Sequence, residues 1–350
     1  MTAREDRRVA SALASLVLGL VALALALGAA EWIVRARGDV ATWMEKNGFS
    51  YARQPTTFPR LYVRAPSTEI VIPEREFEFR IRTNREGLRD VDHPRKKPSR
   101  ELRVAVLGDS FTEGQGAPFE DSFPQVLGRL LQAGRPGRVT ILQGGCAGSD
   151  PVYETLLLED RLLAYDPDWI LLVVNGSDPG DIALRGGFDR ARDGMPSPRW
   201  EWLFARSHLA RLVMMRTLGF DWNGLSPAEN AERAPRVVPT MLEAARRIEA
   251  LAGRERRFVI VSHPVRHELV QAAYESKYAD VLRVLEREGY AVLDILPKLA
   301  KQVPPEQRAA LYWPIDGHFK PEGYRLFAEV VHDQLVRKPE LGYRRSSPKP

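Results

Sequence analysis

Residues 102–114 read LRVAVLGDSFTEG, an apolar run followed at once by a glycine, an aspartate and a serine. The run from Leu102 to Leu107 has the apolar character of a strand that is buried in a parallel sheet. Ser110 then lies just beyond the carboxyl end of that strand, where open α/β sheets keep their reactive groups. Two interpretations stay open on this stretch alone, since Ser110 is either a nucleophile or a residue that caps the next helix.

Further apolar runs are separated by segments with the apolar spacing of helices. The strand-like runs are residues 138–142, 168–174, 258–261 and 290–293, and the helix-like segments are 123–131, 152–163 and 321–335. Alternation of strand and helix is typical of a doubly wound sheet with helices on both faces. The sequence therefore predicts an α/β fold with three layers, α/β/α, around a five-stranded, mostly parallel sheet.

A histidine near the far end of the chain is a candidate base for the serine. Residues 316–323 read DGHFKPEG. A serine needs a base to lose its proton at neutral pH, and that base needs an anionic partner to hold its orientation. His318 and Asp316 would supply both. The alternatives are that Asp316 caps the last helix, or that His263, just after the strand predicted at 258–261, is the base; we prefer His318 because it stands in the Asp-x-His block.

Together, GDSFTEG and DGHFKPEG resemble the SGNH, or GDSL-type, hydrolase superfamily of esterases, lipases and acyltransferases, and its bacterial membrane-anchored members in particular. The resemblance spans residues 103–335. It implies a flavodoxin-like core with Ser110 as nucleophile, His318 as base and Asp316 as the acid that orients it. Many relatives have two residues between the acid and the base, whereas only Gly317 separates them here.

Two more blocks bear on the oxyanion hole that the resemblance implies. Residues 143–150, QGGCAGSD, look like the family's NxGxxG segment, which assigns the Gly145 amide to the hole beside that of Ser110. Residues 175–178 read NGSD where relatives carry GxND. Ser177 then replaces the asparagine whose amide completes the hole, and Asn175 is the reserve candidate.

These roles lead to more than one function. Release of the acyl group to water gives an esterase, and its transfer to a sugar hydroxyl gives an O-acyltransferase that modifies a cell-surface polysaccharide. A third alternative, raised by the replacement at Ser177, is a catalytically weak relative that binds a glycan or a protein partner. We expect an esterase that acts on an acylated small molecule or glycan, with acetyl on a surface glycan as the substrate suggested by family analogy.

Composition excludes several other classes of protein. The chain of 350 residues is 44% hydrophobic and has a net charge of +5, without a basic and aromatic stretch typical of nucleic-acid binding. No histidine or cysteine spacing indicates a metal site, and we expect no cofactor. Cys146 is the single cysteine, so the chain has no intrachain disulfide. We interpret Cys146 as a packing residue rather than a thiol nucleophile.

The amino terminus predicts a membrane anchor. Residues 9–30 carry no charge, and as a helix they would be about 33 Å long, enough to cross a bilayer. We expect a transmembrane signal anchor at 9–33, with Trp32 at the interface and residues 1–8 in the cytoplasm; the alternative is a signal peptide cleaved near Ala30. Basic residues number three before the span and two after it, which favours a catalytic domain on the periplasmic side.

The remaining boundaries follow from these assignments. Residues 34–100 would be a linker and a small β segment, in which 70–72 and 76–83 have strand patterns. Residues 101–338 would be the hydrolase domain, with an insertion at about 179–235, and 339–350 a disordered tail. Arg89 is a candidate for substrate contact. In the insertion, Trp200 and Trp202 are candidates for stacking on a sugar, and the segment is open to interpretation as a lid, a membrane-facing patch or a packed apolar helix.

Overall fold

The computed structural model describes residues 3–41, 64–185, 187–188, 201–220 and 226–342. They fall into two compact units, one of residues 1–54 with 197–228 and one of residues 55–196 with 229–350. Each unit is described by itself.

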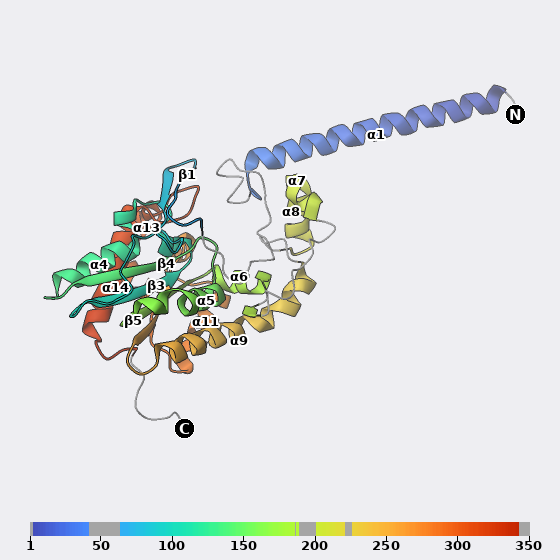
Figure 1. The fold of residues 1–350 in the computed structure, drawn as a ribbon. Helices are drawn as coiled ribbons and strands as arrows, with labels where there is room; N and C mark the ends of the chain where they lie inside the picture. The colour runs from blue at the N-terminus through green and yellow to red at the C-terminus, as the bar shows by residue number, and fades with distance from the viewer. Residues whose placement is uncertain (1–2, 42–63, 186, 189–200, 221–225, 343–350) are drawn as a thin grey trace. The chain divides into compact units, whose positions relative to one another are not determined.

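The second unit contains the predicted sheet. Its strands are β3 (Leu102–Gly108), β4 (Val139–Gly145), β5 (Trp169–Asn175), β6 (Arg257–His263) and β7 (Val292–Leu293). They are ordered β4-β3-β5-β6-β7 and every neighbouring pair is parallel, so β3 lies inside the sheet (Figure 1). The prediction of an α/β fold with a five-stranded parallel sheet is confirmed.

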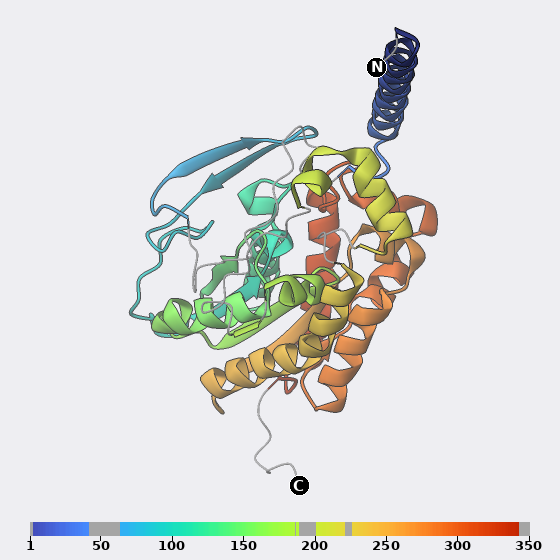
Figure 2. The ribbon, with the colours of Figure 1, turned by 90° about the vertical axis from the view of Figure 1, so that its right-hand side faces the viewer.

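Helices cover both faces of the sheet because successive strand residues alternate between two cores. Val104 and Val106 of β3 belong to one core, and Ala105 and Leu107 belong to the other. The first core is closed by α4 (Phe123–Ala133), α12 (Leu296–Gln302) and α14 (Pro321–Arg337). The second is closed by α5 (Pro151–Asp160), α9 (Pro227–Ala252) and α11 (Ser276–Arg287), and Figure 2 shows the layers from the side.

Shorter helices connect these elements. They are α3 (Ser110–Glu113), α6 (Asp178–Arg185), α10 (Arg266–Gln271) and α13 (Pro305–Arg308), with 3-10 turns η1 (Phe119–Asp121), η2 (Leu162–Tyr165) and η4 (Ala309–Leu311). Two of the expected boundaries lie in or beside described elements. The end of the insertion, expected at about residue 235, lies inside α9, which continues through both Pro235 and Pro239. In the stretch expected to be a disordered tail, the Gly342 carbonyl accepts a hydrogen bond from the Phe258 amide at 2.8 Å; residues 343–350 lie outside the described residues.

An antiparallel hairpin precedes the core, as the alternating pattern predicts. It consists of β1 (Glu69–Pro73) and β2 (Glu78–Arg82), with Ile70 opposite Ile81 and Ile72 opposite Phe79. Phe79 and Ile81 are buried while their neighbours along β2 are exposed. The hairpin therefore has one face packed on the protein and one face in solvent.

The first unit joins the N-terminal helix to part of the insertion. Its helices are α1 (Ala3–Arg37), α7 (Glu201–Arg206) and α8 (His208–Thr217). Glu31 of α1 accepts hydrogen bonds from the Ser207 hydroxyl at 2.8 Å and from the amides of His208 and Leu209 at 3.0 and 2.8 Å, so its carboxylate caps α8.

Two expectations for the insertion concern this unit. The single apolar helix that we considered there is divided at Ser207 into α7 and α8. Trp202 is exposed, and its candidate partner Trp200 lies outside the described residues. Within the described part of the chain, the stretch Ser11–Arg37 is the one helical segment long and apolar enough to span a membrane.

Candidate active site

Ser110 is the first residue of the short helix α3, which starts where β3 ends. Asp109 forms the N-cap, and its Oδ1 accepts a hydrogen bond from the Phe111 amide at 2.9 Å. The serine is thus held at the carboxyl edge of an inner strand, the position that the sequence predicts for it. Asp109 is buried, and burial raises the pKa of its carboxyl group.

The structure brings Ser110, His318 and Asp316 into one hydrogen-bonded line. His318 Nε2 lies 2.7 Å from Ser110 Oγ, and His318 Nδ1 lies 2.7 Å from Asp316 Oδ1. Asp316 is buried, and its carboxylate favours a proton on Nδ1 of the ring. The other ring nitrogen is then free to accept the serine proton.

Gly317 explains how a one-residue spacer can work. Its φ of +89° turns the chain back on itself, and the addition of a Cβ would meet no atom within 4 Å. The turn lets Asp316 Oδ1 accept from the backbone amide of His318 at 3.1 Å as well as from its ring. The shortened spacing is therefore a matter of backbone conformation, which glycine adopts without strain.

The loop after β4 packs directly against the helix that carries Ser110. A Cβ on Gly145 would lie 2.2 Å from the amide nitrogen of Glu113, which only a glycine avoids. The Ala147 amide donates to Glu113 Oε2 at 3.1 Å, and the Cys146 amide donates to the Gly108 carbonyl at 3.0 Å. These contacts fix the end of β4, which carries the Gly145 amide, and the loop that follows it.

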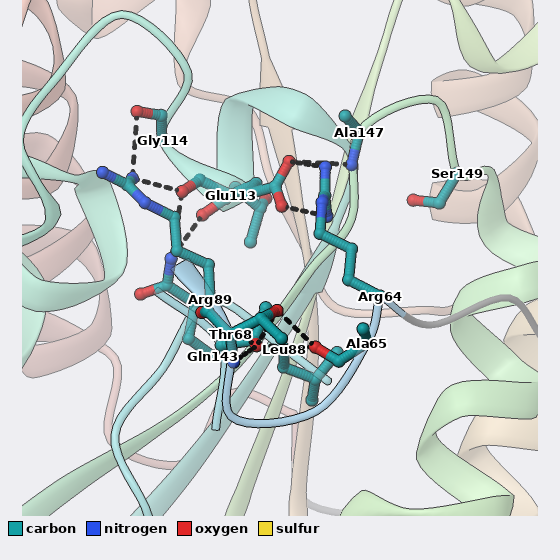
Figure 3. A network of polar contacts seen from close by, with 12 residues as sticks. Arg64, Ala65, Thr68, Leu88, Arg89, Glu113, Gly114, Gln143, Ala147 and Ser149 are labelled. Carbon is teal, nitrogen blue, oxygen red and sulfur yellow. Dashed lines mark hydrogen bonds and ion pairs between the residues drawn. The ribbon is translucent and has the colours of Figure 1, made fainter. Parts of the chain in front are cut away.

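Glu113 is the centre of a buried network around this loop (Figure 3). Its carboxylate forms an ion pair with Arg64, whose second contact, Nη2 to Oε2, is 3.1 Å long. Arg89 donates to the carbonyls of Glu113, Gly114 and Ala117 at 2.8, 3.2 and 2.9 Å. The Arg89 guanidinium is buried in these contacts, which give it a structural position, and the substrate contact considered for it stays a hypothesis.

The two candidates for the third oxyanion donor are engaged with each other. Asn175 Nδ2 donates to Asp109 Oδ2 at 2.7 Å, and Asn175 Oδ1 accepts from both the amide and the hydroxyl of Ser177 at 2.8 Å. The side-chain amide of Asn175 thus holds Asp109, the residue before Ser110, in place. The Ser177 hydroxyl is directed at Asn175 in this arrangement.

Two other residues that the sequence singled out are buried. Neither ring nitrogen of His263 has a hydrogen-bond partner among the described residues, and burial lowers its pKa to about 3, with a smaller contribution from the charge of His318. His263 is therefore neutral and makes no hydrogen bond to Ser110. Cys146 is buried, which raises the pKa of its thiol to about 11 and keeps it protonated, in agreement with a packing role.

Sequence reasoning missed several contributors to this geometry. Gln115 Nε2 donates to Asp316 Oδ2 at 3.1 Å, and the Phe111 ring lies between the rings of His318 and His263, with centroids 4.5 and 4.3 Å away. Both residues stand in or just after GDSFTEG, so proximity to the serine was the one available signal. Among the described residues, no cluster of three or more His, Cys, Asp or Glu side chains is arranged to hold a metal ion.

Comparisons with known proteins identify a family match. The model of the GDSL-like lipase/acylhydrolase family matches residues 106–326. Among solved structures, the chain is similar to a two-domain esterase active on acetylated mannans (15% identity, TM-score 0.44), covering 71% of this chain and 53% of that one. The chain thus spans about half the length of that esterase.

Two further solved structures cover more of the compared protein. A lipase/acylhydrolase from Enterococcus faecalis matches at 14% identity and a TM-score of 0.42 over 70% of this chain and all of that one. A family 3 carbohydrate esterase from Clostridium thermocellum matches at 15% identity and a TM-score of 0.39 over 68% and 96%. No match was found among the curated proteins. With a family match across well over half of its length, the chain belongs to the GDSL-like lipase/acylhydrolase, or SGNH, family and is an ester-bond hydrolase.

Proposed function

We propose that this protein is a membrane-anchored serine esterase that removes an ester-linked acyl group outside the cytoplasm. The observation that carries the catalytic part of the proposal is the line of two 2.7 Å contacts from Ser110 Oγ through His318 to Asp316. A nucleophile, a base and an orienting carboxylate in that order are what acyl transfer requires.

In the first half of the reaction, Ser110 Oγ attacks the ester carbonyl carbon while His318 Nε2 takes the hydroxyl proton. Asp316 stabilises the imidazolium that forms. When the tetrahedral intermediate collapses, the bond to the leaving alcohol breaks, and His318 returns the proton to the alcohol oxygen. The product of this half is an acyl ester on Ser110.

In the second half, water attacks the acyl ester and gives its proton to His318. The bond to Ser110 breaks, the acid leaves, and the proton returns from His318 to the serine. A sugar hydroxyl in place of water would give an O-acyltransferase by the same steps, so the acceptor distinguishes the two activities.

For the oxyanion we propose the amides of Ser110 and Gly145. Ser110 lies in the first turn of α3, where amides lack acceptors within the helix. Gly145 lies at the end of β4, beside α3. We assign Asn175 a supporting role, because its side-chain amide is hydrogen-bonded to Asp109. Ser177 is the less favoured candidate for a third oxyanion donor, because its hydroxyl is bound to Asn175.

The location and the substrate are further parts of the proposal. The stretch Ser11–Arg37 has a mean hydropathy of 2.5 over its most apolar window and none of that window is buried, which suits an uncleaved anchor with the hydrolase unit on the periplasmic side. For the substrate we propose an acetyl group on a surface glycan, by analogy with family members that act on acylated polysaccharides.

Labelling with a fluorophosphonate probe tests the catalytic proposal. An activated Ser110 in the full chain should label, and the Ser110→Ala variant should not. His318→Ala should lose labelling and turnover of a short acyl ester, whereas His263→Ala should retain them if the variant folds. A folded wild-type chain that does not label would favour a glycan- or partner-binding relative.

Product analysis separates the remaining alternatives. With a panel of acetylated glycans, an esterase releases acetate in water, and the yield is unaffected by added acceptor sugars. Transfer of label from the donor to an added glycan, without free acetate, would replace the esterase by an O-acyltransferase.

A further inference from the structure

The hairpin in front of the core lies outside the part of the chain that matches the family, which begins at residue 106. Its tip nevertheless contacts the loop that carries Asp316 and His318. We propose that Glu76, at this tip, is a positioning residue for the catalytic pair. The proposal rests on the esterase function proposed above and adds a component that the family motifs do not contain.

Glu76 binds the catalytic loop through its backbone. One carboxylate oxygen, Oε2, accepts hydrogen bonds from the consecutive amides of Ile315 and Asp316, both at 2.8 Å. These amides come immediately before the carboxylate that orients His318. Hydrogen bonds to an ionised acceptor are about twice as strong as those between neutral groups, so one side chain fixes the start of the Asp-x-His turn.

The tip itself is braced against the same loop. The Glu74 amide donates to the Phe77 carbonyl at 2.9 Å, which closes the turn between β1 and β2. The Phe77 ring packs on that of Trp313 with centroids 5.1 Å apart. Trp313 in turn donates from Nε1 to the Gly116 carbonyl at 2.9 Å, close to the end of α3. The contact of Glu76 is therefore part of a rigid connection rather than an isolated surface bond.

The loop also folds back on itself around Gly317. The Trp313 amide donates to the His318 carbonyl at 2.9 Å, and the Gly317 amide donates to the Trp313 carbonyl at 2.9 Å. With the ends of the loop joined in this way, the amides of Ile315 and Asp316 at its tip point outward to Glu76. Without Glu76 they would have no carboxylate partner, and the position of the Asp316 side chain would be less restricted.

Asp316, the second residue whose amide Glu76 binds, is buried, and its carboxylate accepts from His318 at 2.7 Å and from Gln115 at 3.1 Å. Glu76 thus holds the backbone of the residue whose side chain is held by His318 and Gln115. Glu78, two residues further along the hairpin, is exposed and forms an ion pair with Arg80 at 2.7 Å, and it provides a matched control.

The same segment of the chain also fixes the other side of the site. Arg64 pairs with Glu113, which binds the Ala147 amide in the loop after β4, and Arg89 binds the carbonyls at the end of α3 (Figure 3). Residues 64–92 thus contact the helix of Ser110, the oxyanion loop and the acid–base loop. Glu76 supplies the contact to the acid–base loop.

The test compares Glu76→Ala, Glu76→Gln and Glu78→Ala in the full chain, with kcat and KM for a short acyl ester and the rate of fluorophosphonate labelling. A displacement of about 1 Å at a catalytic group can lower turnover about 100-fold, so we expect Glu76→Ala to lose about 10- to 100-fold in kcat with KM nearly unchanged. Glu76→Gln keeps an oxygen acceptor and should recover most of the loss. Glu78→Ala should match the wild type.

Several outcomes would overturn the inference. They are a wild-type kcat for Glu76→Ala, a loss in Glu76→Ala that raises KM and leaves kcat unchanged, or a Glu76→Gln variant as slow as the alanine one. Thermal unfolding of each variant identifies a chain that is slow because it is unfolded, and in that case the Gln variant decides. A wild-type chain that does not label would instead refute the proposed function, so the two failures are distinguishable.

Discussion

The buried histidine beside the active site makes a quantitative prediction about stability and pH. His263 is 1% exposed, and its ring is packed among Phe111, Phe327 and Phe319, with centroids 4.3, 4.5 and 4.9 Å away. In the part of the chain that the structure describes, neither ring nitrogen has a hydrogen-bond partner. Burial therefore lowers the pKa of His263 to about 3, whereas an unfolded histidine titrates near its ordinary value of 6.5.

The sign of the effect follows from which state binds the proton. Between pH 6.5 and pH 3 the unfolded chain is protonated at this residue and the folded chain is not, so acid favours unfolding. The contribution of His263 is fully present above pH 6.5 and is lost as the pH falls. Between pH 7 and pH 5 the loss amounts to about 2 kcal/mol in the free energy of unfolding.

Urea unfolding of the full chain and of His263→Phe at pH 7, 6 and 5 measures this contribution. The phenylalanine suits the aromatic surroundings and cannot titrate, so the wild type should lose about 2 kcal/mol more than the variant between pH 7 and pH 5. Parallel pH profiles for the wild type and His263→Phe would refute the reasoning.

Three further predictions concern the site. Gly317→Ala forces a left-handed conformation on alanine, which costs about 1–2 kcal/mol of stability, and it should lower kcat because it disturbs His318. Thermal unfolding measures the first effect and ester turnover the second. Wild-type values for both would contradict the proposed role of the turn. Ser177→Ala should reduce kcat by less than about 10-fold, well below the roughly 100-fold cost of a lost oxyanion donor, since its hydroxyl is bound to Asn175; a 100-fold loss would restore Ser177 to the oxyanion hole. Burial, and next the charge of a neighbouring carboxylate, raise the pKa of Glu74 to about 6, so the ionisation of Glu74 opposes folding above that pH. Glu74→Gln should therefore unfold at a higher temperature than the wild type at pH 8 but not at pH 4. The same temperature difference at both pH values would count against this prediction.

Most of the fold could be predicted from the sequence because its strands are buried on both faces. Apolar residues such as those of Leu102–Leu107 fill both cores at once, and such runs are easily recognised. The sequence predicts the second strand at 138–142, but β4 continues to Gly145 because Gln143, Gly144 and Gly145 extend the parallel pairing with β3 and are buried there. Burial of polar and glycine residues leaves no apolar signal.

The helix at 227–252 is not predicted from the sequence, because its local signal is also weak. Pro235 and Pro239 lie within it, and proline normally indicates the end of a helix. Here the apolar face of Val237, Met241 and Ile248 packs on the sheet and maintains the helix across both prolines. Tertiary packing outweighed the local preference of the two prolines to end a helix, and a single sequence does not show such packing.

In the candidate site, motif spacing indicated which residues would meet but not how they would be oriented. The line from Ser110 to His318 joins residues far apart in the chain and was suggested by the two motif blocks. The motif blocks did not indicate the partners of Asn175 and Glu76, because the sequence does not show which backbone or side-chain group a carboxylate or amide side chain will bind.

The capping of α8 by Glu31 has a practical consequence for anyone who wishes to remove the apolar helix. A truncated chain that starts after residue 41 would lose the carboxylate that binds Ser207 and the amides of His208 and Leu209, and with it the Val40 carbonyl that accepts from Arg211. Such a truncation, made to gain solubility, would expose the start of α8 and the guanidinium of Arg211, which is buried in the full chain. A truncation that begins just before Glu31 removes most of the apolar residues and keeps that small helical unit whole.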